Sequence, residues 1–280
     1  MTEAERVRFI IGSQGRTATQ WLSATLSSHN EILCCHGPDF RPHDPEDVTN
    51  FRRHHENVDR FNRLSVAEYF ATLERDACKT ILGNIHGIDP VILVDAQHRP
   101  PFPIQACSIV RHPAAQTESL KNRFIREIEA EGSEKTREMY LAQANIHAKY
   151  FVPFVPRDSV NWNSILFCLS LKNILYFAKG AFSKSLRIYR HEDIVNPNST
   201  ALRDLIIHIS DGRVVPSPAF LRQCFAALPI DSSTNNRSAN TIISEWQPWQ
   251  RLVFFDLLKR LDIINAYRRL GYDLRSLNDY

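Results

Sequence analysis

The sequence lacks the long apolar run that a transmembrane helix requires. No stretch approaches the roughly 20 consecutive apolar residues of a membrane span. The first residues, Met-Thr-Glu-Ala-Glu-Arg, carry acids and lead straight into an apolar run at Val7, which is not the pattern of a signal peptide. We therefore expect a soluble, cytoplasmic protein with no membrane span.

The chain also has little net charge and no paired cysteines. Its formal charge of +3 over 280 residues does not indicate nucleic-acid binding and fits a local basic pocket for an anion. The six cysteines form no CxxC pair and have no metal-ligand spacing, so we expect neither a disulfide framework nor a bound metal. Several lie in apolar runs, where a free thiol behaves as a small buried hydrophobic group in a reducing compartment.

Alternating strand and helix patterns predict the fold. Short apolar strands are expected at 7–11, 32–35, 80–86, 106–110 and 186–189, and helices at 17–28, 65–76, 162–178, 200–209 and 246–270, with a further helix opening at Pro113. This alternation predicts a three-layer α/β fold with a mainly parallel sheet flanked by helices. The absence of repeats and of a clear linker favours a single domain over 1–280.

The loop between the first strand and the first helix has the features of an anion cradle. Gly12 and Gly15 allow a tight turn in which several backbone N–H groups face one anion. The helix N-terminus adds its dipole and unpaired amides, Arg16 adds fixed positive charge, and Thr17 and Thr19 add hydroxyl donors. The alternative is a glycine turn with capping threonines and a solvated arginine. The loop is not a Walker A motif, because Gly-Lys-Ser/Thr is missing.

The stretch Phe-Ile-Ile-Gly-Ser-Gln-Gly-Arg-Thr-Ala-Thr-Gln-Trp-Leu resembles the 5′-phosphosulfate-binding segment of sulfotransferases that use 3′-phosphoadenosine 5′-phosphosulfate. Arg16 takes the basic position of the family pattern, Thr17 the serine, Ala18 the glycine and Thr19 the threonine. Gln20 replaces a second hydroxyl residue. Trp21 matches an aromatic residue that lies against the adenine in some members.

Later segments resemble the same family in the same order. Ser-Ile-Val-Arg-His-Pro, with Arg111, and Ser119 eight residues beyond it, is similar to the 3′-phosphate-binding segment. Arg237 falls in a loop where relatives place another basic contact to this phosphate. The stretch Tyr-Arg-His-Glu-Asp-Ile, from Tyr189, resembles the family's Tyr-Glu-Asp-Leu sequence after a late strand.

The resemblance implies a P-loop-like nucleotide-binding fold. It also implies transfer of a sulfuryl group to an acceptor hydroxyl by in-line displacement, with 3′-phosphoadenosine 5′-phosphate as the product nucleotide and no metal. The general base is expected to be His86, a strand-end histidine beside Gly87. Relatives place a lysine two residues earlier, where this chain has Asn84. The alternatives for the base are His36, His98, Glu118 and Asp95.

The implied partner is a hydroxyl-bearing acceptor, a glycan or a small molecule, and not a nucleic acid. The segments around Arg52 and from 132 to 160 are expected to shape the acceptor's site. Two other functions remain open: a nucleotide-binding protein without catalysis, and a phosphotransferase with a variant P-loop. The missing Gly-Lys and the lack of a magnesium-binding carboxylate pair argue against the second. The sequence indicates no oligomeric state.

Overall fold

The structure is a computed structural model that describes residues 6–14, 17–44, 57–94, 100–131, 134–183, 186–228 and 238–274. The chain divides into two compact units. Unit 1 consists of Met1–Val110 and Ser183–Ile230, and unit 2 consists of Arg111–Phe182 and Asp231–Tyr280. Each unit is described by itself, and the single domain over 1–280 stays a prediction.

Unit 1 is built on a sheet of five parallel strands. The strands are β1 (Val7–Gly12), β2 (Ile32–His36), β3 (Ile81–Ile85), β4 (Gln105–Val110) and β5 (Arg187–Arg190), in the order β2-β3-β1-β4-β5. All four pairings are parallel, and β1 pairs with β3 and β4 on its two sides. The chain leaves β1 toward β2 and leaves β4 toward β5, so a topological switch point lies between β1 and β4, where open parallel sheets bind ligands.

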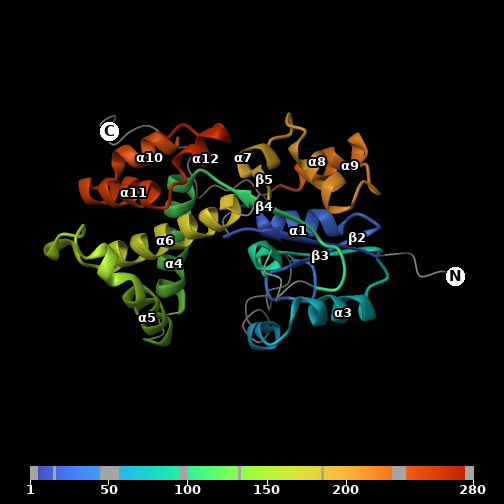
Figure 1. The fold of residues 1–280 in the computed structure, drawn as a ribbon, viewed down its shortest axis with the longest axis horizontal. Coiled ribbons are helices and arrows are strands. Elements are labelled where there is room, and N and C mark those ends of the chain that lie inside the picture. The colour runs from blue at the N-terminus through green and yellow to red at the C-terminus, as the bar shows by residue number, and fades with distance from the viewer. Residues whose placement is uncertain are drawn as a thin grey trace. The chain divides into compact units, whose positions relative to one another are not determined.

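Helices cover both faces of this sheet (Figure 1). On one face, Phe9 and Ile11 of β1 pack with Leu22 and Leu26 of α1 (Thr19–Ser27) and with α8 (Ala201–Ile209). On the other face, Ile10 packs with α3 (Val66–Asp76). The helices α1 and α3 lie on opposite faces because crossover connections are right-handed. The connection from β1 to β2 and the return from β2 to β3 run in opposite directions along the sheet, so their helices lie on opposite faces. The three-layer, P-loop-like α/β fold expected from the sequence is confirmed.

Shorter elements complete unit 1. The helical turn η1 (Pro90–Val94) lies between β3 and β4 and contacts β1 and β4. The short helix α7 (His191–Ile194) follows β5, and α9 (Pro218–Ala226), which the sequence analysis does not predict, begins at an N-cap serine, Ser217, whose side chain accepts a hydrogen bond from the N–H of Phe220.

Unit 2 is helical in its described part. Its helices are α4 (Pro113–Glu131), α5 (Glu134–Phe151), α6 (Trp162–Ser183), α10 (Ala239–Glu245), α11 (Pro248–Arg260) and α12 (Ile264–Arg269), with a helical turn η2 (Arg157–Ser159) before α6. Neither α5 nor α10 is predicted from the sequence. Among the described helices, α6 alone is long and apolar enough to cross a membrane, and 56% of its most apolar window is buried within the protein, as in a core helix.

The single helix predicted over 246–270 is wrong. The structure ends α11 at Arg260 and begins α12 at Ile264, because Asp262 between them has a φ of 54°. That left-handed conformation cannot continue a right-handed helix. Ile263 and Tyr267 beyond the break are buried, so the apolar pattern continues across it and hides it. The predicted stop at Gly271 is confirmed, with a φ of 81° just after α12.

The cysteines are free thiols, as the sequence predicts. Five are buried and Cys78 is exposed. Burial raises the pKa of Cys35 and that of Cys107 to about 12 each, so both thiols are protonated at neutral pH. They act as small apolar groups in the sheet rather than as nucleophiles.

Candidate functional site

The candidate anion cradle begins where β1 ends, at Gly12. A Cβ atom at this position would lie 2.4 Å from Cδ of Pro90 and 3.0 Å from Oγ of Ser108. Glycine is therefore required here by the close approach of η1 and β4. Its predicted use as a flexible anion-binding residue stays a prediction.

Two of the predicted hydroxyl donors are held in place by hydrogen bonds within unit 1. Thr17 is fully buried, and its hydroxyl forms a hydrogen bond with the hydroxyl of Ser13. Thr19, the first residue of α1, lies with its Oγ1 3.0 Å from Nε2 of His36 at the end of β2. The loop hydroxyls thus have fixed positions at the carboxyl ends of β1 and β2.

The N-terminus of α1 is formed by a strained residue. Ala18 is the N-cap, with φ 55° and ψ 30°, and its carbonyl accepts the hydrogen bond from the N–H of Leu22 at 2.9 Å. This left-handed conformation favours glycine, the residue that the family pattern has at this position. No side chain caps the helix, and its first turn has no acid, so its N–H groups remain suited to an anion.

Gln20 and Trp21 differ in exposure. Gln20 is exposed, whereas Trp21 is only 6% exposed. The Trp21 indole donates to the carbonyl of Cys224 at 3.1 Å and stacks near Phe225, with ring centroids 6.3 Å apart. Core packing therefore accounts for Trp21, and its contact with an adenine stays a prediction.

His86 lies on the same loop system. Its backbone N–H donates to the carbonyl of Ile11 at 3.0 Å, and its ring Nδ1 lies 2.7 Å from the carbonyl oxygen of Ser13. Because a carbonyl can only accept, Nδ1 carries the proton in this hydrogen bond, and Nε2 of the neutral ring is then the basic nitrogen. His86 also has a φ of 74°, an unusual conformation for a residue with a Cβ atom.

Two further histidines lie beside His86. The ring centroid of His36 lies 5.7 Å from that of His86 and 5.7 Å from that of His43. Burial lowers the pKa of His43 below its ordinary value, so this ring is neutral at pH 7. The sequence analysis names His36 only as an alternative base and does not single out His43. Their proximity depends on strand order and on the turn after β2, which no local pattern reveals.

Asn84, which occupies the position of the family lysine, has a structural role. It is fully buried, and its Nδ2 donates to the Gly37 carbonyl and to the Tyr69 hydroxyl, at 2.8 Å each. Its Oδ1 accepts from the N–H groups of Gly87 and Ile88 at 2.8 and 3.2 Å. These bonds fix the turn that presents His86.

Arg111 and Ser119 belong to unit 2. Arg111 is partly buried and directly follows Val110, the last residue of β4. His112 caps α4 by accepting a hydrogen bond from the N–H of Ala114 at 3.3 Å. Ser119 lies two turns along α4 and is 4% exposed. A shared 3′-phosphate at Arg111 and Ser119 stays a prediction, as do the anion contacts of Gly15, Arg16 and Arg237, which lie outside the described residues.

The alternative bases fall into two groups. Glu118 forms an ion pair with Lys121 and accepts a hydrogen bond from the indole of Trp246 at 3.2 Å, so both of its oxygens are engaged. His98 and Asp95 lie outside the described residues. Of the candidates that the structure describes, His86 and His36 are therefore the ones beside the loop hydroxyls.

The part of the chain that the structure describes offers no ligand set of the kind that holds metal ions in proteins. No group of three or more His, Cys, Asp and Glu side chains there is arranged to hold a metal ion. The cradle instead offers hydroxyls, helix N–H groups and histidine. Such groups can bind an oxyanion and accept a proton from a hydroxyl.

Comparisons with known proteins return two solved structures. A sulfotransferase from Alicyclobacillus acidocaldarius is 13% identical with a TM-score of 0.47, over 95% of this chain and 99% of that chain. The sulfotransferase domain from the curacin biosynthetic pathway is 15% identical with a TM-score of 0.47, over 98% of this chain and 100% of that chain. No family model and no curated protein matches the sequence. The function is therefore argued from the residues.

Proposed function

We propose that the protein is a sulfotransferase that moves a sulfuryl group from 3′-phosphoadenosine 5′-phosphosulfate to the hydroxyl of an acceptor. The observation that carries this proposal is the hydrogen bond between Nδ1 of His86 and the carbonyl of Ser13. It joins a base of suitable tautomer to the loop whose sequence resembles the 5′-phosphosulfate segment. In this proposal, the donor and the acceptor hydroxyl meet at the carboxyl ends of β1 and β3.

In the proposed reaction, Nε2 of His86 takes the proton of the acceptor hydroxyl as its oxygen attacks sulfur. A new oxygen–sulfur bond forms while the bond from sulfur to the bridging phosphate oxygen breaks, and 3′-phosphoadenosine 5′-phosphate leaves. Arg16, Thr17 and the N–H groups at the start of α1 stabilise the negative charge that develops on the leaving phosphate. The sulfuryl group carries less charge than a phosphoryl group, and the proposed reaction uses no metal.

Donor recognition is proposed to use Arg111, Ser119 and Arg237 at the 3′-phosphate. The acceptor is proposed to be a glycan or a small molecule with a free hydroxyl, and the protein to work in the cytoplasm. The roles of Arg111 and Ser119 rest on the resemblance of the segment around residue 111, that of Arg237 on its loop, and the cytoplasmic location on the unpaired cysteines.

A competition experiment tests the proposal. Binding of 3′-phosphoadenosine 5′-phosphate, ATP and 5′-AMP is measured by calorimetry, and transfer of labelled sulfate is then assayed over a panel of hydroxyl compounds. The proposal expects preference for the 3′-phosphorylated nucleotide and transfer of label. Binding without transfer to any acceptor would favour a nucleotide-binding protein without catalysis, and preference for ATP a phosphotransferase.

Arg16→Ala adds a check on the leaving-group role. It should remove most transfer, since the leaving phosphate loses its main counter-charge. Arg8→Ala is the matched control, because Arg8 lies on β1 and is paired with Glu74. Equal transfer by the Arg16 and Arg8 variants would contradict the role of Arg16.

A further inference from the structure

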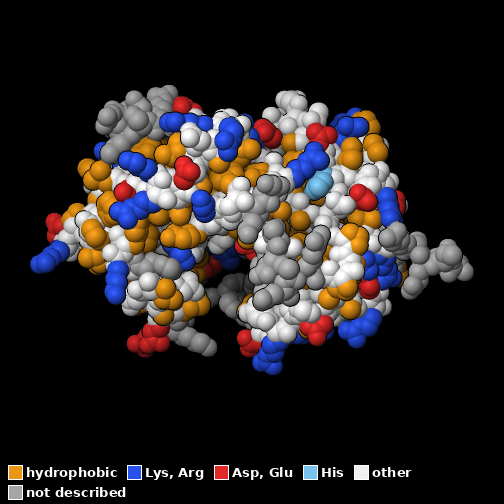
Figure 2. All heavy atoms as spheres, in the orientation of Figure 1, with side chains coloured by type: hydrophobic (Ala, Val, Ile, Leu, Met, Phe, Trp, Pro, Cys, Tyr) orange, Lys and Arg blue, Asp and Glu red, His pale blue; other side chains and the backbone are white. Residues whose placement is uncertain are grey.

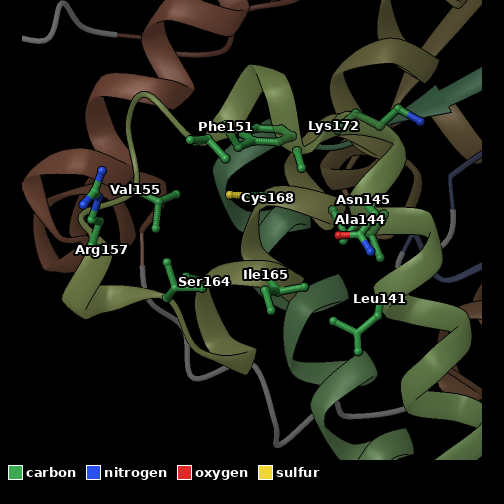
Figure 3. Close-up of a pocket in the computed structure, with 14 residues that line it drawn as sticks. Leu141, Ala144, Asn145, Phe151, Val155, Arg157, Ser164, Ile165, Cys168 and Lys172 are labelled. Atoms are coloured by element: carbon green, nitrogen blue, oxygen red, sulfur yellow. The ribbon is translucent and has the colours of Figure 1, made fainter.

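A cavity lies within unit 2, between α5 and α6. It has a volume of about 490 Å3 and is formed by residues between Leu141 and Lys172. Volumes of 300–1,000 Å3 with mostly apolar walls are typical of small-molecule sites. Figure 3 shows Cys168 near the middle of this cavity, with Phe151 at its upper edge, Val155 on one side and Leu141 on the other.

The cavity exists because α5 presents small side chains toward α6. Ala144 and Ala148 lie one turn apart on α5 and line the cavity, opposite Ile165 and Cys168 of α6. Two alanines leave the space that larger side chains would fill in a packed helix pair. The small side chains of Ala144 and Ala148 thus account for the cavity.

Apolar side chains continue from the cavity to the protein surface. Val152 and Val160, which line it, are 68% and 61% exposed. Figure 2 shows hydrophobic side chains gathered where Figure 1 draws α5 and α6. The cavity is therefore the enclosed part of a larger exposed apolar surface, which is typical of a binding site.

The charged side chains that line the cavity indicate which kind of ligand it could bind. Among the described side chains that line the cavity, the charged ones are the bases Arg157 and Lys172. Figure 3 places them on opposite sides of the cavity, with the amide of Asn145 on the side of Lys172. Arg157 is exposed on η2, whereas Lys172 is partly buried, and burial lowers its pKa. An anion beside Lys172 would offset that cost.

We propose that this cavity binds an amphipathic molecule with an apolar body and one carboxylate or sulfate group, whose anion is held by Lys172 and Asn145. The apolar body lies against Phe151, Ile165 and Cys168. The site lies wholly within unit 2, and its occupancy does not depend on the sulfotransferase proposal.

The test measures binding of decanoate, 1-decanol and decylammonium to the full chain, without donor nucleotide and below micelle-forming concentrations. The wild-type protein is expected to bind decanoate saturably and about tenfold more tightly than decanol, the difference that a charge-assisted hydrogen bond provides. Decylammonium is expected to bind more weakly than decanol. Absence of saturable binding, or equal binding of decylammonium and decanoate, would overturn the proposal.

Matched variants locate the site. Lys172→Met should remove the tenfold preference for decanoate, whereas Lys179→Met, an exposed lysine of α6 outside the cavity, should keep it. Ala148→Phe should abolish binding of both decanoate and decanol, and Ala142→Phe on an exposed position of α5 should not. Far-ultraviolet circular dichroism confirms that each variant is folded.

Two results would contradict this placement. Decanoate binding that survives in the folded Ala148→Phe variant would place the ligand elsewhere. A wild-type dimer in sedimentation that Ala148→Phe dissociates, without amphiphile binding, would assign the surface to a second copy of the chain.

Discussion

Nδ1 of His86 lies 2.7 Å from the carbonyl oxygen of Ser13, and this contact fixes both the orientation and the tautomer of the ring. The carbonyl belongs to the loop that leads into α1, and His86 follows the neighbouring strand β3. A shift of either segment would move both the loop and the ring. The candidate base and the loop proposed to bind the donor are therefore held together by a direct hydrogen bond.

The first prediction tests the basic nitrogen of His86. His86→Asn keeps a donor to the Ser13 carbonyl and tolerates a positive φ, but it lacks Nε2. Transfer should fall by about 10²–10⁴-fold, the contribution of a general base, with nucleotide affinity nearly unchanged. His208→Asn is the control, and near-normal transfer by His86→Asn would direct attention to His36.

The second prediction concerns nucleotide selection by Arg111. Arg111→Ala should reduce the preference for 3′-phosphoadenosine 5′-phosphate over 5′-AMP by about tenfold or more, because a charge-assisted hydrogen bond to phosphate is lost. Calorimetric titration with both nucleotides measures the ratio. Arg123→Ala is the control, since Arg123 lies on α4, the helix that follows Arg111, and is paired with Glu127. An unchanged ratio in Arg111→Ala contradicts the placement of the 3′-phosphate site.

The third prediction concerns metals. Sulfate transfer should be unaffected by a chelator, because the proposed mechanism relies on hydroxyls, helix N–H groups, arginine and histidine. Labelled transfer with and without the chelator measures this. Loss of transfer that magnesium restores would favour the phosphotransferase.

The fourth prediction concerns the strain at Ala18. Ala18→Gly should raise the free energy of unfolding by roughly 0.5–1 kcal/mol, because glycine adopts a φ of 55° without the steric cost of a Cβ atom. Urea unfolding measures the change. Ala24→Gly within α1 is the control and should lower stability by a similar amount. A destabilised Ala18→Gly protein would show that the packing of the Ala18 methyl group outweighs the strain.

The fifth prediction concerns acid stability. Burial lowers the pKa of both His43 and His208 below the ordinary value of 6.5, so the folded protein holds their protons less tightly than the unfolded chain. Their contribution to stability is present above pH 6.5 and is lost as pH falls through the lowered values. The double variant His43→Gln, His208→Gln should therefore lose less stability than wild type between pH 7.5 and pH 5.5. Urea unfolding at both pH values decides this, and equal losses would exclude a role for these histidines.

The sequence predicts the fold of unit 1 well, because buried parallel strands are short apolar runs and each is followed by a clear turn signal. All five strands and the end of the first strand at Gly12 follow patterns of this kind, whereas the order of the strands in the sheet does not. The helix α5 escapes prediction, since its small and polar residues include few large apolar side chains. The break at Asp262 escapes because a left-handed residue leaves the apolar spacing on either side unchanged.

The candidate site is predictable only in part. The residues of the β1–α1 loop and His86 are adjacent to recognisable strand ends, so topology alone brings them to one edge of the sheet. The pairing of Thr19 with His36 and the burial of Trp21 against Cys224 and Phe225 depend on contacts between distant segments. Local pattern holds no information on such contacts.

The buried hydrogen bonds of Asn84 also determine which substitutions the turn after β3 can accept. A lysine at this position would break the bonds to Gly37, Tyr69, Gly87 and Ile88 and would bury a charge, at a cost of several kcal/mol. Asn84→Lys on its own is therefore expected to destabilise the turn that presents His86.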